Sequence, residues 1–186
     1  MDKYSLPTAT VLAGKVCEFR TDYRVILKIF EVFNDPDLLE RERFIVALRF
    51  FYKTDDYLND IEHAAQEMLD FIAGGKAEPD KSEQHKKPLY DWDQDFNLII
   101  APINKNMGTD VRGLDYLHWW TFLSAFMEIG ECTFSTFVGI RDKLNKNIKL
   151  DKVEERILKE NRDSIVIKQK YDSTTQALMD EIMGRG

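Results

Sequence analysis

The stretch Leu117-His118-Trp119-Trp120, followed by Phe122 and Phe126, contains two of the three tryptophans and one of the three histidines of the chain. Aromatic side chains bury the largest apolar areas, so this segment is expected to anchor a core or an interface. Successive residues of a helix point about 100° apart. We therefore expect one tryptophan to pack inward on Phe96 or Phe126 and the other to border a groove or a partner, with core packing of both as the alternative.

The composition is that of an ordinary globular protein. The chain has 186 residues, 44% hydrophobic and 32% charged, which fits one domain or two small ones. No apolar run approaches the roughly 20 residues of a membrane span, and the N-terminus lacks the pattern of a signal peptide. Cys17 and Cys132 lie far apart, so we expect reduced thiols and a cytoplasmic protein.

The net charge of −7 is unevenly distributed. Residues 1–140 hold 15 Lys/Arg against 24 Asp/Glu, whereas residues 141–170 hold 10 against 6. A basic segment is able to contact nucleic acid. Its acidic residues are interleaved with the basic ones, however, and this pattern favours a solvated helix face. No nucleic-acid or membrane partner is expected.

The spacing of apolar residues predicts a mainly α protein. Residues 8–19 form two β-prone runs around Ala13-Gly14 and predict a short hairpin. The rest predicts a bundle of about six to seven helices. These helices begin near Thr21 or Asp22, Asp35-Pro36, Thr54 or Asp55, Tyr90 to Trp92 (with a kink at Pro102), Asp115 (running to Ile129), Thr133 or Ser135, and Leu150.

Composition divides the predicted fold into two helical halves. Residues 74–88 contain no large apolar residue and predict a flexible linker. This gives an N-terminal region (1–73) with the hairpin and three helices, and a C-terminal helical region (89–171) with the Leu-His-Trp-Trp motif. Residues 172–186 are expected to be a weakly ordered tail.

One cluster has the residue types of a chemical site. Asp91 and Asp95 are four residues apart and Asp93 lies between them, so with His118 they suggest a divalent-metal site or an acid–base pair. The competing interpretation is that three carboxylates in a first helical turn stabilise the helix dipole. No second histidine or cysteine stands at metal-ligand spacing. We expect neither an enzyme nor a cofactor.

His118 is expected to be a buried imidazole that binds a neighbouring carboxylate. Its predicted partner is Asp115 or a carboxylate of the Asp91–Asp95 turn. Docking on that turn would hold one tryptophan inside and leave the other near a binding groove.

Several of these residues together resemble one phage family. The order Tyr90-Asp91-Trp92, Asp95, Ile99, Ala101, Gly108, then Leu117-His118-Trp119-Trp120, Phe122 and Ile140-Arg141 is similar to the gene-product-fifteen family of siphophages and prophages of Gram-positive bacteria. The stretch Phe19-Arg20-Thr21-Asp22-Tyr23-Arg24 resembles the family's N-terminal signature. The resemblance covers most of residues 16–145 and fades beyond Leu150, and Pro102 departs from the pattern.

The resemblance implies a role in tail morphogenesis. Genes of this family usually lie between those of the tail-tube and tape-measure proteins, a place typical of tail assembly chaperones. The implied protein acts in the host bacterial cytoplasm, holds the tape-measure protein and recruits tail-tube subunits. Its partner would bind in a helix-in-groove mode with one tryptophan as anchor. The alternative is a structural tail-completion or connector component of the virion, and self-association into a homo-oligomer stays open.

Overall fold

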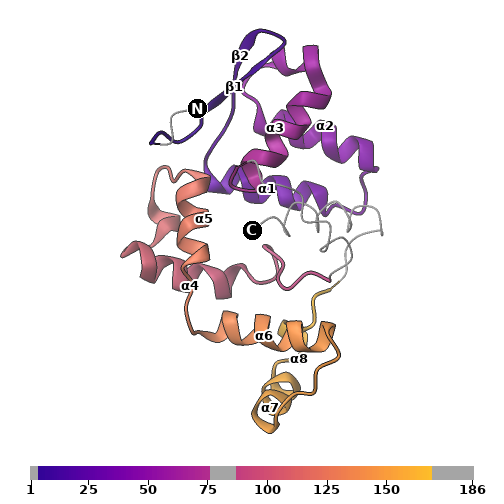
Figure 1. The fold of residues 1–186 in the computed structure, drawn as a ribbon, viewed down its shortest axis with the longest axis vertical. Coiled ribbons are helices and arrows are strands. Elements are labelled where there is room, and N and C mark those ends of the chain that lie inside the picture. The colour runs from indigo at the N-terminus through magenta and orange to yellow at the C-terminus, as the bar shows by residue number, and fades with distance from the viewer. Residues whose placement is uncertain (1–3, 76–86, 169–186) are drawn as a thin grey trace. The chain divides into compact units, whose positions relative to one another are not determined.

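A computed structural model describes residues 4–75 and 87–168. This part of the chain forms eight α-helices, two short 3-10 helices and one antiparallel hairpin (Figure 1). The prediction of a mainly α fold with an N-terminal hairpin is therefore confirmed. Most of the predicted linker, residues 76–86, and the predicted tail, residues 172–186, lie outside the described residues. No helix in the described part is both long and apolar enough to cross a membrane.

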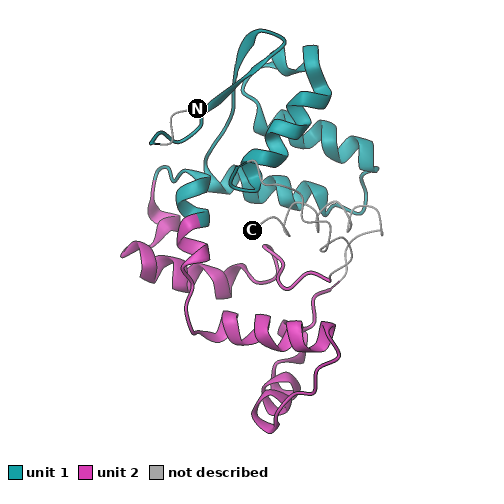
Figure 2. Cartoon of the chain, viewed as in Figure 1, with its two compact units in different colours: residues 1–84, 115–123, 170–186 teal, residues 85–114, 124–169 magenta. Residues whose placement is uncertain are grey.

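The described chain divides into two compact units (Figure 2). Unit 1 contains residues 4–75 and 115–123, and unit 2 contains residues 87–114 and 124–168. This differs from the predicted division, which placed the whole of residues 89–171 in one region. The segment with Leu117-His118-Trp119-Trp120 returns to unit 1 because its backbone pairs with the residues before the first helix, through a bridge between Asp22 and His118.

Unit 1 begins with the predicted hairpin. Strand β1 (Ala9–Leu12) pairs with β2 (Lys15–Glu18), with Leu12 opposite Lys15. The turn residues Ala13 and Gly14 both have positive φ, +48° and +77°, the conformation that two-residue hairpin turns require. One face of the hairpin places Leu12 and Cys17 in the core. A lone hairpin is barely stable in water, so this burial supports it.

Three helices complete the core of unit 1. Helix α1 (Tyr23–Phe33) packs against α2 (Glu40–Phe51), and α2 packs against α3 (Ile61–Ile72), which follows the 3-10 helix η1 (Asp55–Asp60). The predicted cap Asp22 is confirmed, since its carboxylate accepts the backbone N–H of Arg24. The interior of the unit is strongly aromatic, with stacked or edge-on rings at Phe19, Phe51, Tyr52, Tyr57 and Phe71.

Unit 2 is formed by the remaining helices. Helix α4 (Phe96–Met107) runs through Pro102 and is followed by the 3-10 helix η2 (Val111–Gly113). Helix α5 (Trp119–Met127) passes from unit 1 into unit 2 after Leu123. Then come α6 (Thr133–Asn145), α7 (Lys152–Glu160) and the four-residue α8 (Arg162–Ile165). A core of Phe137, Ile140, Leu150 and Ile165 joins α6 to the segments around α7 and α8.

Four predicted helix starts are wrong. The third helix, predicted from Thr54 or Asp55, begins at Ile61, because Asp55–Asp60 forms the 3-10 helix η1. Helix α2 begins at Glu40, because Asp35 uses its carboxylate to accept the N–H of Asp37 in a turn. Helix α4 begins at Phe96, after a turn that contains Asp91 and Asp95. Helix α5 begins at Trp119 and ends at Met127. The predicted start at Asp115 fails because the backbone of residues 117–119 pairs with Thr21–Tyr23.

Candidate partner-binding site

The signature carboxylates of unit 2 stabilise a turn in front of α4. The carboxylate of Asp91 accepts the backbone N–H groups of Asp93 (3.0 Å) and Gln94 (2.7 Å). The N–H of Asp91 in turn donates to Oδ2 of Asp95 at 3.0 Å. The three acidic residues therefore precede the first turn of α4. The prediction that they lie within this first turn is wrong. The carboxylates of Asp91 and Asp95 thus accept backbone N–H groups and stabilise this turn.

Arg141 joins this turn to two other segments. Its guanidinium forms a two-pronged ion pair with Asp95, at 2.7 and 2.9 Å, and the side chains are 4% and 1% exposed. The remaining donors bind the carbonyls of Leu89 (2.9 Å), Ser164 (2.7 Å) and Ile165 (2.6 Å). All five N–H donors of an arginine are thereby used. Arg141 is a positioning residue with no donor left for a ligand.

Tyr90 and Trp92 extend the same turn into an aromatic cluster. Trp92 lies 4.6 Å from Phe126 between ring centroids, and Tyr90 lies 5.1 Å from Phe126 and 6.1 Å from Phe134. Burial raises the pKa of Tyr90 to about 12, so its hydroxyl is neutral at physiological pH. These rings stabilise unit 2 through apolar area and favourable ring geometry.

The Leu117–Trp120 segment of unit 1 is held first through its backbone. The N–H of Tyr23 donates to the carbonyl of Leu117 at 3.0 Å, and the N–H of Trp119 donates to the carbonyl of Thr21 at 2.7 Å. The N–H of Leu117 donates to Asp22 at 3.3 Å. The two family signatures, Phe19–Arg24 and Leu117–Trp120, are therefore one structural unit.

His118 is buried, as predicted, but its predicted carboxylate partner is wrong. Nε2 donates to the carbonyl of Pro7 at 3.0 Å, and Nδ1 accepts the N–H of Trp120 at 3.1 Å. Both ring nitrogens are thus used within unit 1, and neither binds Asp115 or the Asp91–Asp95 turn. Burial lowers the pKa of His118, and the hydrogen bond with Pro7 opposes that effect only in part. The imidazole is neutral at physiological pH.

The paired tryptophans bind the end of α3. The indole N–H of Trp119 donates to the carbonyl of Ile72, and that of Trp120 to the carbonyl of Phe71, both at 2.9 Å. The last carbonyls of a helix have no partner within the helix, so the two indoles act as its C-terminal cap. Trp119 is 1% exposed and Trp120 half-buried, which confirms that one tryptophan points inward.

Within unit 1, the inward tryptophan packs on two phenylalanines that the sequence analysis did not name as its partners. The ring of Trp119 lies 6.1 Å from that of Phe30 and 5.7 Å from that of Phe122. Phe122 also stacks on Tyr23 at 4.5 Å. Trp119 and Phe122 are therefore core residues of unit 1. Trp120 stacks on Phe71 and keeps part of its ring accessible.

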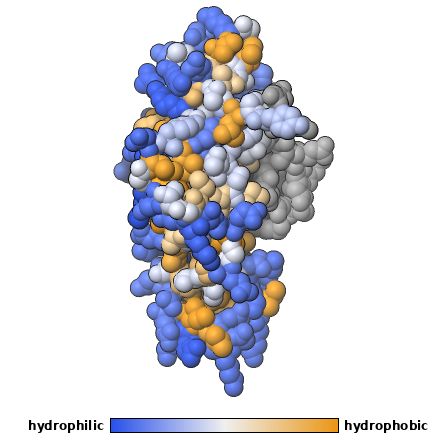
Figure 3. All heavy atoms as spheres, turned by 90° about the vertical axis from the view of Figure 1, so that its left-hand side faces the viewer, coloured by the Kyte–Doolittle hydropathy of each residue, from blue (hydrophilic) through white to orange (hydrophobic). Residues whose placement is uncertain are grey.

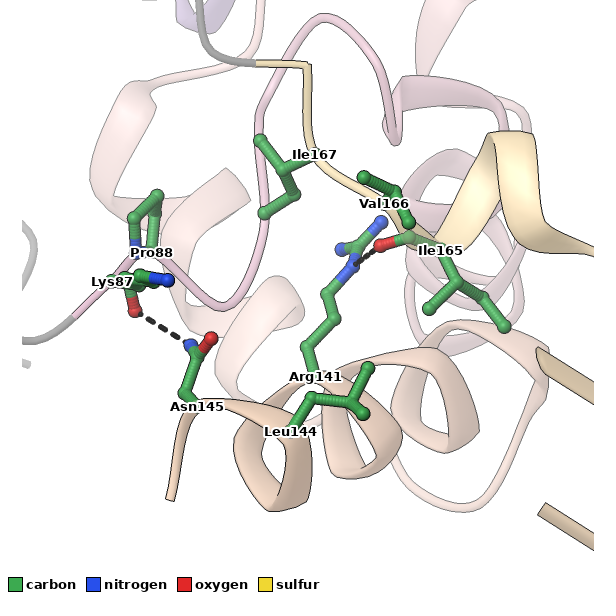
Figure 4. Close-up of a pocket in the computed structure, with 8 residues that line it drawn as sticks. All are labelled: Lys87, Pro88, Arg141, Leu144, Asn145, Ile165, Val166 and Ile167. Atoms are coloured by element: carbon green, nitrogen blue, oxygen red, sulfur yellow. Dashed lines mark hydrogen bonds between the residues drawn. The ribbon is translucent and has the colours of Figure 1, made fainter. Parts of the chain in front are cut away.

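A pocket of about 350 Å³ opens in unit 2 beside Arg141 (Figure 4). Helix α6 contributes Arg141, Leu144 and Asn145, and the segments on either side contribute Lys87, Pro88, Ile165, Val166 and Ile167. Asn145 donates to the carbonyl of Lys87 at 3.1 Å and closes one end. Leu144 is 42% exposed and Val166 47% exposed, so the apolar wall is open to a partner. We call this feature the unit 2 pocket.

The pocket was not predicted from the sequence. Its walls come from residues 87–88, 141–145 and 165–167, and no periodic pattern links these three segments. The one available signal was Arg141, which the family signature includes. Among the described residues, no three side chains of His, Cys, Asp or Glu lie close enough together to hold a metal ion.

Comparison with known proteins identifies the family. The family model described as "Bacteriophage Gp15 protein" matches residues 3–172, most of the chain. No curated protein and no solved structure matches it. The chain thus belongs to the bacteriophage Gp15 protein family and is a structural or morphogenesis protein of a phage.

Proposed function

We propose that this protein is a tail assembly chaperone that binds the tape-measure protein in the host bacterial cytoplasm and helps to recruit tail-tube subunits. It acts by binding, without catalysing a reaction and without a cofactor. The observation that carries the proposal is the unit 2 pocket, an apolar site of about 350 Å³ with half-exposed walls. Pockets that accept large side chains or small ligands have volumes of roughly this size.

The pocket suits one apolar side chain on a helical partner. Leu144 lies on α6, and Val166 and Ile167 lie on an irregular segment that faces it (Figure 4). An amphipathic helix binds such a site by inserting anchors spaced three or four residues apart. A tape-measure protein is long and helical, so it offers many such segments. A site with a single pocket would bind each of them weakly and reversibly, as an assembly chaperone requires.

Trp120 is a second proposed contact. Its indole N–H already binds Phe71, so it offers a partner only the accessible part of its ring. Aromatic rings are frequent anchors at protein interfaces. The neighbouring signature residues Leu117, His118, Trp119 and Phe122 are buried. His118 positions Trp120 by accepting its backbone N–H.

The surface charge fits a protein that keeps an apolar partner in solution. The chain carries a net charge of −7, and net charge opposes association of loaded complexes. On the face drawn in Figure 3, apolar side chains gather in separate patches on a largely hydrophilic surface.

The test is co-expression with the tape-measure protein encoded by the same phage. We expect the wild-type protein to move the tape-measure protein from the insoluble to the soluble fraction. The double variant Leu144→Asp/Val166→Asp should lose this effect, because it places two charges in the pocket wall. The matched control is Val153→Asp, since Val153 is 54% exposed on α7 and does not line the pocket.

Two outcomes would refute the proposal. The first is equal solubility of the tape-measure protein with and without this chain. The second is a double variant that folds, judged by its thermal unfolding, and still solubilises the partner as well as the control does.

A further inference from the structure

The unit 2 pocket has a basic rim on an acidic protein. Among its eight lining residues the only charged side chains are Lys87 and Arg141. Arg141 is neutralised by Asp95. Lys87 is exposed, and no carboxylate of the described residues pairs with it. Lys168, which directly follows the lining residue Ile167, is also exposed and likewise has no acidic partner in the described part of the chain.

The last turn of α6 and the residues that follow it are also rich in lysine. Residues 143–149 include Lys143, Lys146 and Lys149 but no Asp or Glu. Lys143 pairs with Glu154, and Lys146 pairs with Asp142 at 2.8 Å. The pairs balance two of these charges, and Lys149 stays exposed without a carboxylate partner among the described residues. The excess around the pocket is therefore positive, opposite to the net charge of the chain.

We propose that the segment bound in the unit 2 pocket is an amphipathic helix that carries carboxylates within one turn of its apolar anchor. This inference rests on the proposed use of the pocket as the partner site and specifies the chemistry of the partner. Exposed charge pairs contribute little affinity each, but a complementary rim selects partners by sign and accelerates association. A basic helix with the same anchors meets repulsion at Lys87 and Lys168.

The binding probes are two synthetic helical peptides with identical leucine positions and opposite flanking charges. One carries Glu and the other Lys at the positions three and four residues from the central leucine. Fluorescence anisotropy with the full-length protein measures both affinities at low and high salt. We expect the Glu peptide to bind about tenfold more tightly at low salt, and the preference to shrink at high salt because exposed charges are screened.

Reversing the charge of the rim lysines tests whether they cause the preference for the Glu peptide. The double variant Lys87→Glu/Lys168→Glu should reverse the preference and favour the Lys peptide. The control Lys28→Glu changes an exposed lysine of α1 in unit 1 and should keep the wild-type preference. Equal affinity of the two peptides for the wild-type protein, or an unchanged preference in the rim variant, would overturn the inference.

The failure of this inference and the failure of the proposed function give different results. If the tape-measure protein is solubilised through the pocket but the two peptides bind alike, only the charge selection fails. If the Glu peptide binds at the basic rim but the tape-measure protein stays insoluble, the chaperone role fails while the pocket's preference stands.

Discussion

The two partners of His118 fix its tautomer and make it sensitive to acid. The carbonyl of Pro7 only accepts, so Nε2 carries the hydrogen, and the N–H of Trp120 only donates, so Nδ1 carries the lone pair. A proton added to Nδ1 would place two donors face to face at the start of α5. The lowered pKa of His118 follows from burial of a ring that has no carboxylate partner.

We predict that the free energy of unfolding decreases as the pH falls below about 6.5, the ordinary pKa of histidine. In that range the unfolded chain binds a proton at residue 118 and the folded chain does not, so acid favours unfolding. His118→Asn retains an acceptor for the N–H of Trp120 but does not titrate. It should cost about 1 kcal/mol near neutrality, for the lost bond to Pro7, and weaken the pH dependence.

Urea unfolding at several pH values measures this effect. The control is His63→Asn, which changes an exposed histidine of α3 and should keep the wild-type slope. A His118→Asn variant with the same slope as the wild type would show that another group causes the acid sensitivity.

The Asp95–Arg141 pair should dominate the stability of unit 2. Asp95→Asn leaves a guanidinium that is 4% exposed without a counter-charge, and breaking a buried pair in this way costs about 3–5 kcal/mol. The control is Asp110→Asn, because Asp110 and Arg112 form the same kind of pair at 2.8 Å with side chains 51% and 54% exposed. This change should cost far less, because an ion pair in contact with water contributes little to stability. Urea unfolding measures both, and similar losses would contradict the argument.

Helix ends show how local sequence controls an element. Gly108 ends α4 with φ of +69°, and the N–H of Thr109 donates back to the carbonyl of Asn104, the arrangement called a Schellman motif. Gly139 instead lies inside α6. A Cβ atom at either position would meet no atom within 4 Å. The two sites therefore differ in backbone conformation and not in available space.

We predict opposite effects of alanine at these two glycines. Gly108→Ala should lower the free energy of unfolding by about 1–2 kcal/mol, because a side chain strains the left-handed conformation. Gly139→Ala should raise it by about 0.5–1 kcal/mol, because glycine costs more entropy than alanine within a helix. Thermal unfolding of the two variants and the wild type in one buffer measures both changes in stability. A change of the same sign in both would refute the explanation.

Apolar spacing predicted where most helices lie but not where all of them begin. The hairpin and α1 depend on neighbours in the sequence, so local residues predicted them. The start of α5 depends on a tertiary contact. The extended residues before Trp119 pair with Thr21–Tyr23, nearly a hundred residues earlier, and this pairing overrides the capping potential of Asp115.

The same distinction holds for the site residues. Asp95 and Arg141 were recognised as signature residues, but their pairing across 46 positions was not, because no local pattern encodes it. His118 was assigned a carboxylate partner because nearby acids are common partners of histidine. The structure gives it the carbonyl of Pro7 instead, at a separation of 111 residues. Every residue has a backbone carbonyl, so a sequence pattern does not indicate which carbonyl accepts a hydrogen bond.

At the scale of the whole molecule, most signature residues build the fold, and the proposed binding site is small. Leu117, His118, Trp119, Phe122, Asp91, Asp95, Trp92 and Arg141 are buried. A permanent component of a particle is held by large, apolar interfaces, commonly of 2,000 Å² or more. The unit 2 pocket has apolar walls from only a few residues, among them Leu144, Val166 and Ile167. Such a site suits transient contacts.

We therefore predict that the protein acts during assembly and is absent from finished particles. Mass spectrometry of lysates from infected cells should detect its peptides at the time of tail assembly, and purified virions should contain the tail-tube and tape-measure proteins without it. The tail-tube protein of the same particles serves as the internal control for recovery. Peptides of this chain in virions, in a fixed ratio to a tail protein and resistant to high-salt washing, would instead identify it as a structural tail-completion or connector component. The pocket would then be part of a permanent interface, and the double variant Leu144→Asp/Val166→Asp would yield particles that lack the protein.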